Sequence, residues 1–211
     1  MDHGRGLGSI TDPTIGDPLF FPSQTTSYTV FVTDASGCTG TGTIIVNVNQ
    51  LPVVDAGADV AVCDGQGTTI GGSPTGPLGS TFSWSPVSGL GNTTDANPDA
   101  QPLATTTYTV VVTDVNQCMT ADDVTVTWNA LPAISAGPDT SFCLGGSVQL
   151  NATGAGQFIW SPVDGLSSTT VNNPIASAST TITYTVSLTD ANNCVNSDEV
   201  LVVVNGLPNA D

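Results

Sequence analysis

Cysteine and aspartate are the residues of this chain whose types and spacing could do chemistry. The five cysteines are Cys38, Cys63, Cys118, Cys143 and Cys194. Regularly spaced cysteines are typical of a disulfide framework in a protein that works in an oxidising environment. Because their number is odd, they cannot all pair within one chain.

Aspartates recur at a fixed distance from these cysteines. Asp59, Asp114, Asp139 and Asp190 each lie four residues before a cysteine, and Asp55 precedes Asp59. Carboxylate oxygens gathered at one end of a repeat are ligands that Ca²⁺ accepts, so these five residues are candidate calcium ligands. The alternative is that a turn aspartate accepts hydrogen bonds from its own backbone as an Asx-turn. We prefer the Asx-turn because the chain has no dense aspartate motif of the EF-hand kind, and we expect no other cofactor.

Composition excludes several classes of function. The chain has 211 residues, 18 Asp and Glu against one Lys or Arg, and a formal net charge of −17. This charge repels phosphate backbones, so we expect no nucleic-acid partner. No apolar run of about 18 residues is present, so we expect no direct membrane insertion. The only histidine, His3, has no Ser and Asp arranged around it for nucleophilic catalysis, and we predict that the chain is not an enzyme.

The chain is built from a repeated unit. Tyr-Thr-Val recurs at Tyr28, Tyr108 and Tyr184, and a cysteine follows each tyrosine at the same distance, at Cys38, Cys118 and Cys194. The second interval between these positions is slightly shorter than the first. A near-constant period of this length is the signature of a repeat architecture, in which each unit is one small structural body.

The repeat divides the chain into predicted domains. Residues 53–131 and 132–208 are two complete repeats. Residues 1–52 form the C-terminal half of another repeat, of which residues 1–5 are atypical, and residues 209–211 open the next one. A half-sandwich alone would expose apolar faces and unpaired edges. We therefore expect the chain to be a segment of a longer tandem array.

Apolar and polar residues alternate within each repeat. Tyr108, Val110 and Val112 share one face of a predicted strand rich in Thr and Val. This pattern favours half-buried β-strands, and no segment has the apolar period of a helix. We predict about seven short strands in each repeat, forming antiparallel immunoglobulin-like β-sandwiches arranged end to end. Trp84 and Trp160 would fill the cores, and the tyrosines would form a tyrosine corner.

Two acidic pairs lie on the last predicted strand of each complete repeat. They are Asp122 with Asp123, and Asp198 with Glu199. We expect these pairs to solvate an open sheet edge, because charged side chains on an edge also hinder edge-to-edge aggregation.

Three motifs carry a resemblance to a known family. They are Ala-Gly-x-Asp-x-x-x-Cys-x-Gly, Trp-Ser-Pro-Val-x-Gly-Leu and Thr-Tyr-Thr-Val-x-x-Thr-Asp-x-x-x-Cys. Their order resembles the PKD-like and Ig-like repeats of giant Bacteroidota cell-surface adhesins, including those associated with gliding motility and type IX secretion. The resemblance implies a secreted, extracellular protein at the cell surface. It also implies an array of many domains, so we expect neighbouring repeats of the same long chain as partners, while lateral self-association into a fibre stays open.

Two disulfide patterns are compatible with the repeats. The simpler pattern has one bridge in each repeat, Cys63–Cys118 and Cys143–Cys194. The first and last strands of an immunoglobulin-type sandwich run parallel, so Cys63 and Cys118 would lie at opposite ends of the sandwich, about 33 Å apart. A disulfide requires Cα atoms within about 7 Å.

The second pattern joins consecutive repeats. Cys63 would lie where its repeat ends, Cys194 would lie where the next begins, and only residues 130–132 separate these ends. We prefer this Cys63–Cys194 bridge, while the pairing within repeats stays open because the topology is assumed. If cysteines pair in this way across every junction, the partners of Cys38, Cys118 and Cys143 lie in repeats outside these 211 residues.

Two functions follow from these observations. The first is a structural repeat segment of a long extracellular surface protein, acting as an adhesin stalk or surface filament without catalysis. The alternative is an extracellular Ig-like module that binds a carbohydrate or another ligand. Such a module needs exposed aromatic rings, and Phe20, Phe21 and Trp128 are the aromatic residues left for a surface.

Overall fold

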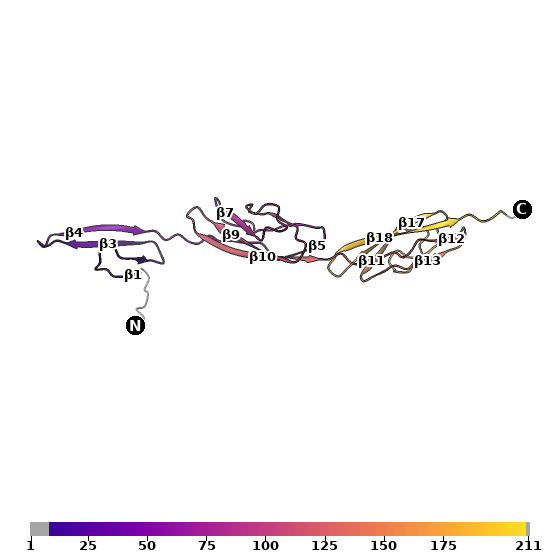
Figure 1. Cartoon of the computed structure of the whole chain (residues 1–211), viewed down its shortest axis with the longest axis horizontal. Helices are drawn as coiled ribbons and strands as arrows, with labels where there is room; N and C mark the ends of the chain where they lie inside the picture. Colours follow the sequence, from indigo (N-terminus) through magenta and orange to yellow (C-terminus); the bar gives the residue numbers. More distant parts are fainter. Residues whose placement is uncertain (1–8, 210–211) are drawn as a thin grey trace, which may run out of the picture.

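The computed structural model describes residues 9–209 as a row of β-rich bodies that follow one another along a single long axis (Figure 1). The expectations for His3, for residues 1–5 and for the last two residues of 209–211 lie outside the described residues. No helix occurs between residues 9 and 209, and hence none long and apolar enough to cross a membrane. The predicted all-β fold class is confirmed.

The middle repeat, residues 53–131, contains a four-stranded sheet faced by a short two-stranded one. The larger sheet has the order β5-β10-β9-β7, and the smaller one pairs β6 with β8. The strands are β5 (Val60–Cys63), β6 (Thr68–Thr69), β7 (Thr81–Ser85), β8 (Asp99–Ala100), β9 (Thr106–Thr113) and β10 (Met119–Asn129).

The C-terminal repeat, residues 132–208, has the same large sheet, in the order β12-β18-β17-β15. Two small sheets accompany it, one pairing β13 with β16 and one pairing β11 with β14. The strands are β11 (Ile134–Ser135), β12 (Thr140–Cys143), β13 (Val148–Gln149), β14 (Thr153–Gly154), β15 (Gln157–Ser161), β16 (Ile175–Ala176), β17 (Ile182–Thr189) and β18 (Val195–Asn205).

The predicted half-repeat, residues 1–52, contains two separate two-stranded sheets in its described part. They pair β1 with β2 and β3 with β4. The strands are β1 (Ser9–Ile10), β2 (Phe20–Phe21), β3 (Thr26–Thr33) and β4 (Thr39–Val46). The β3–β4 hairpin corresponds to β9–β10 of the middle repeat, because Tyr28 of β3 and Tyr108 of β9 occupy the same position of the repeated motif.

The alternating pattern of the sequence places the predicted side chains in the cores. Tyr108, Val110 and Val112 are fully buried, and Trp84 and Trp160 are 2% and 1% exposed. The Trp84 indole N–H donates to the Asp95 carbonyl at 3.0 Å, so its polar atom is satisfied inside the core. Truncating a buried tryptophan costs about 3–5 kcal/mol, so each indole is a main support of its repeat.

The tyrosine corner is present in both complete repeats. The Tyr108 hydroxyl donates to the Ser88 carbonyl at 2.8 Å, and the Tyr184 hydroxyl donates to the Asp164 carbonyl at 2.6 Å. Burial raises the pKa of both phenols. Gly89 follows Ser88 with φ +77°, and a Cβ there would meet the Tyr108 hydroxyl at 2.9 Å. The glycine of the Trp-Ser-Pro-Val-x-Gly-Leu motif therefore lets the loop approach the tyrosine.

Candidate functional site: the stapled junction

Cys63 and Cys194 form a disulfide between the middle and C-terminal repeats. Their Cα atoms are 5.6 Å apart, and 131 positions separate them in sequence. Cys194 is fully buried and Cys63 is 8% exposed. This is the preferred pattern of the two that the sequence left open, and neither bridge of the pattern within repeats forms.

Strand register explains why Cys63 reaches the junction. β5 runs parallel to β10, and Cys63 stands opposite Asn129, the last residue of β10. The Asp64 amide also donates to the Asn129 carbonyl at 2.8 Å. Cys118 lies directly before the other end of the 11-residue β10 strand, which is about 35 Å away. The parallel first and last strands thus carry Cys63 away from Cys118 and toward the next repeat.

The other half of the junction is a turn that holds Cys194 against the linker. The Cys194 amide donates to Asp190 Oδ1 at 2.8 Å, which fixes the turn between β17 and β18. Two residues later, Asn196 Nδ2 donates to the Pro132 carbonyl at 3.0 Å. The linker is therefore fastened by a side-chain amide next to the covalent bridge.

The turn aspartates accept hydrogen bonds from backbone amides. Asp114 Oδ1 accepts hydrogen bonds from the Asn116 and Cys118 amides at 2.8 and 2.9 Å. Asp190 accepts the equivalent pair from the Asn192 and Cys194 amides. These are the expected Asx-turns, and they hold each turn cysteine in the same conformation.

The remaining candidate calcium ligands also meet backbone N–H groups. Asp59 Oδ1 accepts from the Thr125 amide, Asp139 Oδ1 from the Leu201 amide, and Asp55 Oδ1 from the Gly57 amide. Residues 9–209 contain no group of three or more His, Cys, Asp or Glu side chains placed to hold a metal ion. The five aspartates lie in loops and turns next to the strands, and no three of them come together in one group.

One member of each acidic pair on the last strand has a role that the sequence did not indicate. Asp122 Oδ2 accepts from the Ala56 amide and Asp198 Oδ2 from the Ala136 amide, each at 2.9 Å. The hydrogen bond from the Ala136 amide, with that from Glu199, lowers the pKa of Asp198. Asp122 and Asp198 lie part-exposed on this strand edge, and beyond the expected solvation each accepts a backbone hydrogen bond. β5 pairs only with one end of β10, and β12 pairs only with one end of β18. Beside the unpaired part of each long strand, the aspartate accepts a hydrogen bond from the segment that precedes β5 or β12.

Three thiols remain unpaired: Cys38, Cys118 and Cys143. Cys143 stands opposite Asn205 at the end of β18, as Cys63 stands opposite Asn129. Cys118 occupies the same Asx-turn position as Cys194. Each unpaired thiol of the complete repeats therefore matches one partner of the observed bridge.

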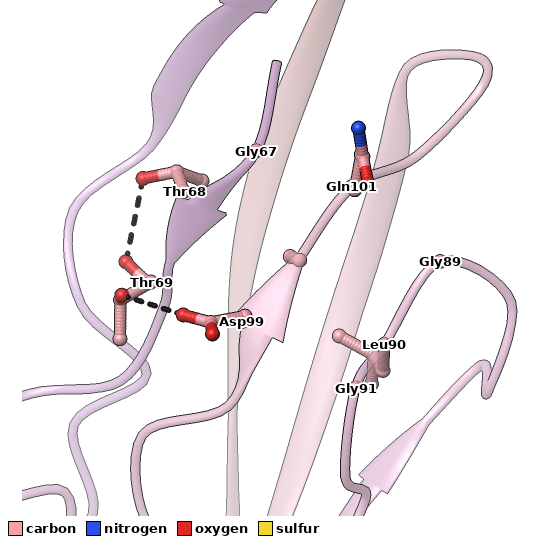
Figure 2. A pocket seen from close by; sticks show the side chains of 9 residues that line it. Gly67, Thr68, Thr69, Gly89, Leu90, Gly91, Asp99 and Gln101 are labelled. Atoms are coloured by element: carbon pink, nitrogen blue, oxygen red, sulfur yellow. Dashed lines mark hydrogen bonds between the residues drawn. The ribbon is translucent and has the colours of Figure 1, made fainter. Parts of the chain in front are cut away.

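A shallow pocket in the middle repeat is the other candidate site (Figure 2). Its lining comes from the β6 and β8 strands and the loop around Leu90, and it contains no aromatic side chain. Thr69 Oγ1 donates to Asp99 Oδ1 at 2.9 Å within this lining. Carbohydrate sites typically place aromatic rings against the sugar, and this pocket offers none.

The aromatic residues left for a surface do not form one patch. Trp128 is half-buried at the end of β10, and its indole nitrogen is buried without a hydrogen-bond partner. Phe20 is half-buried with its ring 4.3 Å from that of Tyr28, and Phe21 is 53% exposed. Trp128 therefore lies apart from the phenylalanines. Phe31 on β3 is 74% exposed, which the sequence did not indicate, and it lines a pocket of residues 10–44 together with Phe20 and Tyr28.

No protein-family model matches the chain, and no curated protein matches it. Three distantly similar solved structures illustrate the fold. The insect immune protein hemolin is 15% identical with a TM-score of 0.39, and the match covers 85% of this chain and 56% of hemolin. The Sidekick-1 immunoglobulin domains 1–4 are 13% identical with a TM-score of 0.38, and the match covers 97% of this chain and 66% of that one.

The human desmocollin-1 ectodomain is a further distant match. It is 14% identical with a TM-score of 0.31, and the match covers 94% of this chain and 49% of the ectodomain. The chain thus spans about half the length of hemolin and of this ectodomain. TM-scores this low say nothing about what the chain binds or does.

Proposed function

We propose that this chain is a structural segment of a long extracellular surface protein, an adhesin stalk or surface filament that carries force and performs no catalysis. The observation that carries the proposal is the Cys63–Cys194 bridge, which joins consecutive repeats end to end. Its neighbouring repeats in the same long chain are the expected partners, and lateral association would make a fibre. The repeat motifs that resemble Bacteroidota surface adhesins, together with a disulfide, support an extracellular location.

The bridge changes the path along which force travels. A pull on the two ends of the chain passes from Cys63 across the disulfide to Cys194, and it bypasses the 131 positions between them. Most of both complete repeats lies in this bypassed segment. Unfolding of the middle or C-terminal repeat therefore adds almost no length to the loaded chain.

The same pairing at every junction would make the array nearly inextensible. The next bridge would start at Cys143, inside the bypassed segment, so consecutive bridges overlap. The loaded path would then contain about 25 residues for every two repeats, which span at most roughly 85 Å. Two folded repeats with 11-residue strands span roughly 75 Å before their linkers are added. A stapled array would thus keep its folded length under load.

Single-molecule stretching of the full chain by its two ends tests the mechanical part. The oxidised protein should reach a final length roughly 450 Å shorter than a Cys63→Ser/Cys194→Ser variant, because the bypassed residues never enter the loaded path. The Cys143→Ser variant keeps the bridge and is the matched control. Equal final lengths for the oxidised protein and the double variant would contradict the proposal.

Immunogold labelling tests the location. Antibodies raised against this chain should label filaments or stalks on intact, unpermeabilised cells of the source organism. Labelling that requires permeabilised cells would overturn the extracellular part of the proposal, whatever the stretching experiment shows.

A further inference from the structure

The pocket on the small sheet of the middle repeat exposes backbone that side chains do not cover (Figure 2). Three of its nine lining residues are glycines, namely Gly67, Gly89 and Gly91. A Cβ on Gly91 would meet nothing closer than the Asp99 carbonyl oxygen, at 3.7 Å. Glycine at such positions leaves room for a ligand beside the main chain. The pocket volume of about 620 Å³ lies within the range of small-ligand sites.

Strand register places two polar side chains in this pocket. Asp99 and Gln101 are two positions apart in an extended segment, so they share one face of the small sheet. Thr69 Oγ1 donates to Asp99 Oδ1 at 2.9 Å, and Gln101 Nε2 donates to the Gly65 carbonyl at 2.9 Å. These bonds hold both side chains in place. They leave Asp99 Oδ2 and Gln101 Oε1 as acceptors without a partner among residues 9–209.

The charge of the Asp99 carboxylate is not neutralised within the described chain. Residues 9–209 contain no Lys, Arg or His, and the formal net charge of the whole chain is −17. A concave site lined by one sign of charge concentrates ligands of the opposite sign. A ligand that fits this pocket therefore brings both a positive charge and N–H donors.

We infer that this pocket binds an arginine side chain presented by a basic partner polypeptide. A guanidinium group is planar and carries five N–H donors in a rigid fork that matches a carboxylate. Asp99 Oδ2 and Gln101 Oε1 would accept from this fork, and the flat group would lie on the exposed glycine backbone. A lysine ammonium is more strongly hydrated, so it gains less from a shallow pocket. This binding is separate from the load-bearing role proposed above.

The C-terminal repeat supplies a matched comparison within the same chain. An isolated β-bridge joins the neighbouring loop to the small sheet at the same place in both complete repeats, which fixes the correspondence. Ile175 stands in place of Asp99, and the Ser167 hydroxyl accepts a hydrogen bond from the Ile175 amide at 2.9 Å. No carboxylate occurs at the equivalent positions, which are Ser147, Gln149, Gly165, Ser167, Ile175 and Ser177.

NMR titration of the isotope-labelled, oxidised full chain tests the inference. The probe is the blocked peptide acetyl-Ala-Arg-Ala-amide. The backbone amide signals of Gly67, Gly91 and Gln101 should shift and saturate, whereas those of Ser167 and Ser177 should not move. A peptide with citrulline, which has the shape of arginine but no charge, should bind on the order of 10-fold more weakly. A peptide with lysine should also bind more weakly.

Three variants separate the pocket from general attraction to an acidic protein. Asp99→Asn should weaken binding on the order of 10-fold. Gly91→Leu fills the pocket without changing the charge and should remove the shifts. Asp123→Asn alters an exposed carboxylate on the large sheet and should leave the affinity unchanged. Asp99 and Gly91 are both exposed, so an unchanged thermal midpoint confirms that their variants are folded.

Four results would overturn the inference. One is the absence of shifts at the pocket amides. Another is a lysine or citrulline peptide that binds as tightly as the arginine peptide. A third is an equal loss of affinity in Asp99→Asn and Asp123→Asn, because net charge alone would then explain the binding. The fourth is an equal response of the C-terminal repeat.

Discussion

Removal of the bridge should uncouple the unfolding of the two complete repeats. The perturbation is the Cys63→Ser/Cys194→Ser variant, which removes the cross-link without leaving reactive thiols at the junction. The two sandwiches have separate hydrophobic cores, one around Trp84 and one around Trp160. The bridge and the short linker are therefore the main connections through which the unfolding of one repeat affects the other.

The size of the effect follows from chain entropy. If one repeat unfolds while the other stays folded, the bridge closes a loop of about 65 to 70 residues, which stabilises the folded repeat by about 4.4 kcal/mol. If both unfold, the loop spans 131 positions and the bridge stabilises the folded pair by about 5 kcal/mol in total. Once one repeat has unfolded, the bridge therefore stabilises the other repeat by only about 0.6 kcal/mol. The bridge couples the two repeats by about 4 kcal/mol.

Calorimetry and hydrogen exchange measure this coupling together. The oxidised protein should unfold both complete repeats in one transition, and the double variant should unfold them separately at midpoints on the order of 20 °C lower. Hydrogen–deuterium exchange by mass spectrometry assigns each opening event to one repeat without altering a core residue.

The Cys143→Ser variant controls for the loss of a thiol, because Cys143 is exposed and unpaired. It should keep the midpoint and the single transition of the oxidised protein. Unchanged midpoints in the double variant, or complete repeats that still open together without the bridge, would refute the entropy argument.

Three further predictions address the hydrogen bonds of the repeats. Tyr184→Phe should destabilise the C-terminal repeat by about 0.5–1.5 kcal/mol in thermal denaturation, because it removes the part-buried hydrogen bond from the Tyr184 hydroxyl to the Asp164 carbonyl. Tyr28→Phe should have no such effect, because the Tyr28 hydroxyl has no hydrogen-bond partner. The pKa of Asp198 lies below its ordinary value of 3.8, so its stabilising contribution is present above that pH and is lost as the pH falls through the folded-state pKa. In the Asp198→Asn variant, the urea midpoint should therefore fall less steeply as the pH is lowered into the acid range. Addition of Ca²⁺ should leave the thermal midpoint unchanged, because each of the five candidate ligands already accepts a backbone N–H; a raised midpoint would restore the calcium hypothesis.

Much of the fold could be predicted because the same pattern of apolar and polar residues occurs in each repeat. The alternation of Tyr108, Val110 and Val112 recurs in each unit, and a period of two leaves only one face for the core. The position of Trp84 before a Pro and a Gly marked it as a core residue beside a loop. The junction bridge could be preferred over a bridge within repeats because a parallel first and last strand carries Cys63 away from Cys118.

The roles of the carboxylates could not be predicted in the same way. Asp122 and Asp198 have the sequence pattern of exposed edge residues. The pattern does not reveal that β5 and β12 are only four residues long and leave most of the neighbouring strand uncovered. The carboxylates act as acceptors for the segment that crosses this open stretch, and such a hydrogen bond depends on the path of a loop.

The amino-acid sequence alone determined the repeating unit, its β-strands, its core residues and the two positions from which a bridge could start. Each of these depends on periodicity and residue type, which are local properties of the chain. Only the tertiary structure decided which cysteines meet and which carboxylates hold a backbone amide. These outcomes depend on distances between segments that are far apart in the chain, and those distances are set by strand register and by the path of the loops.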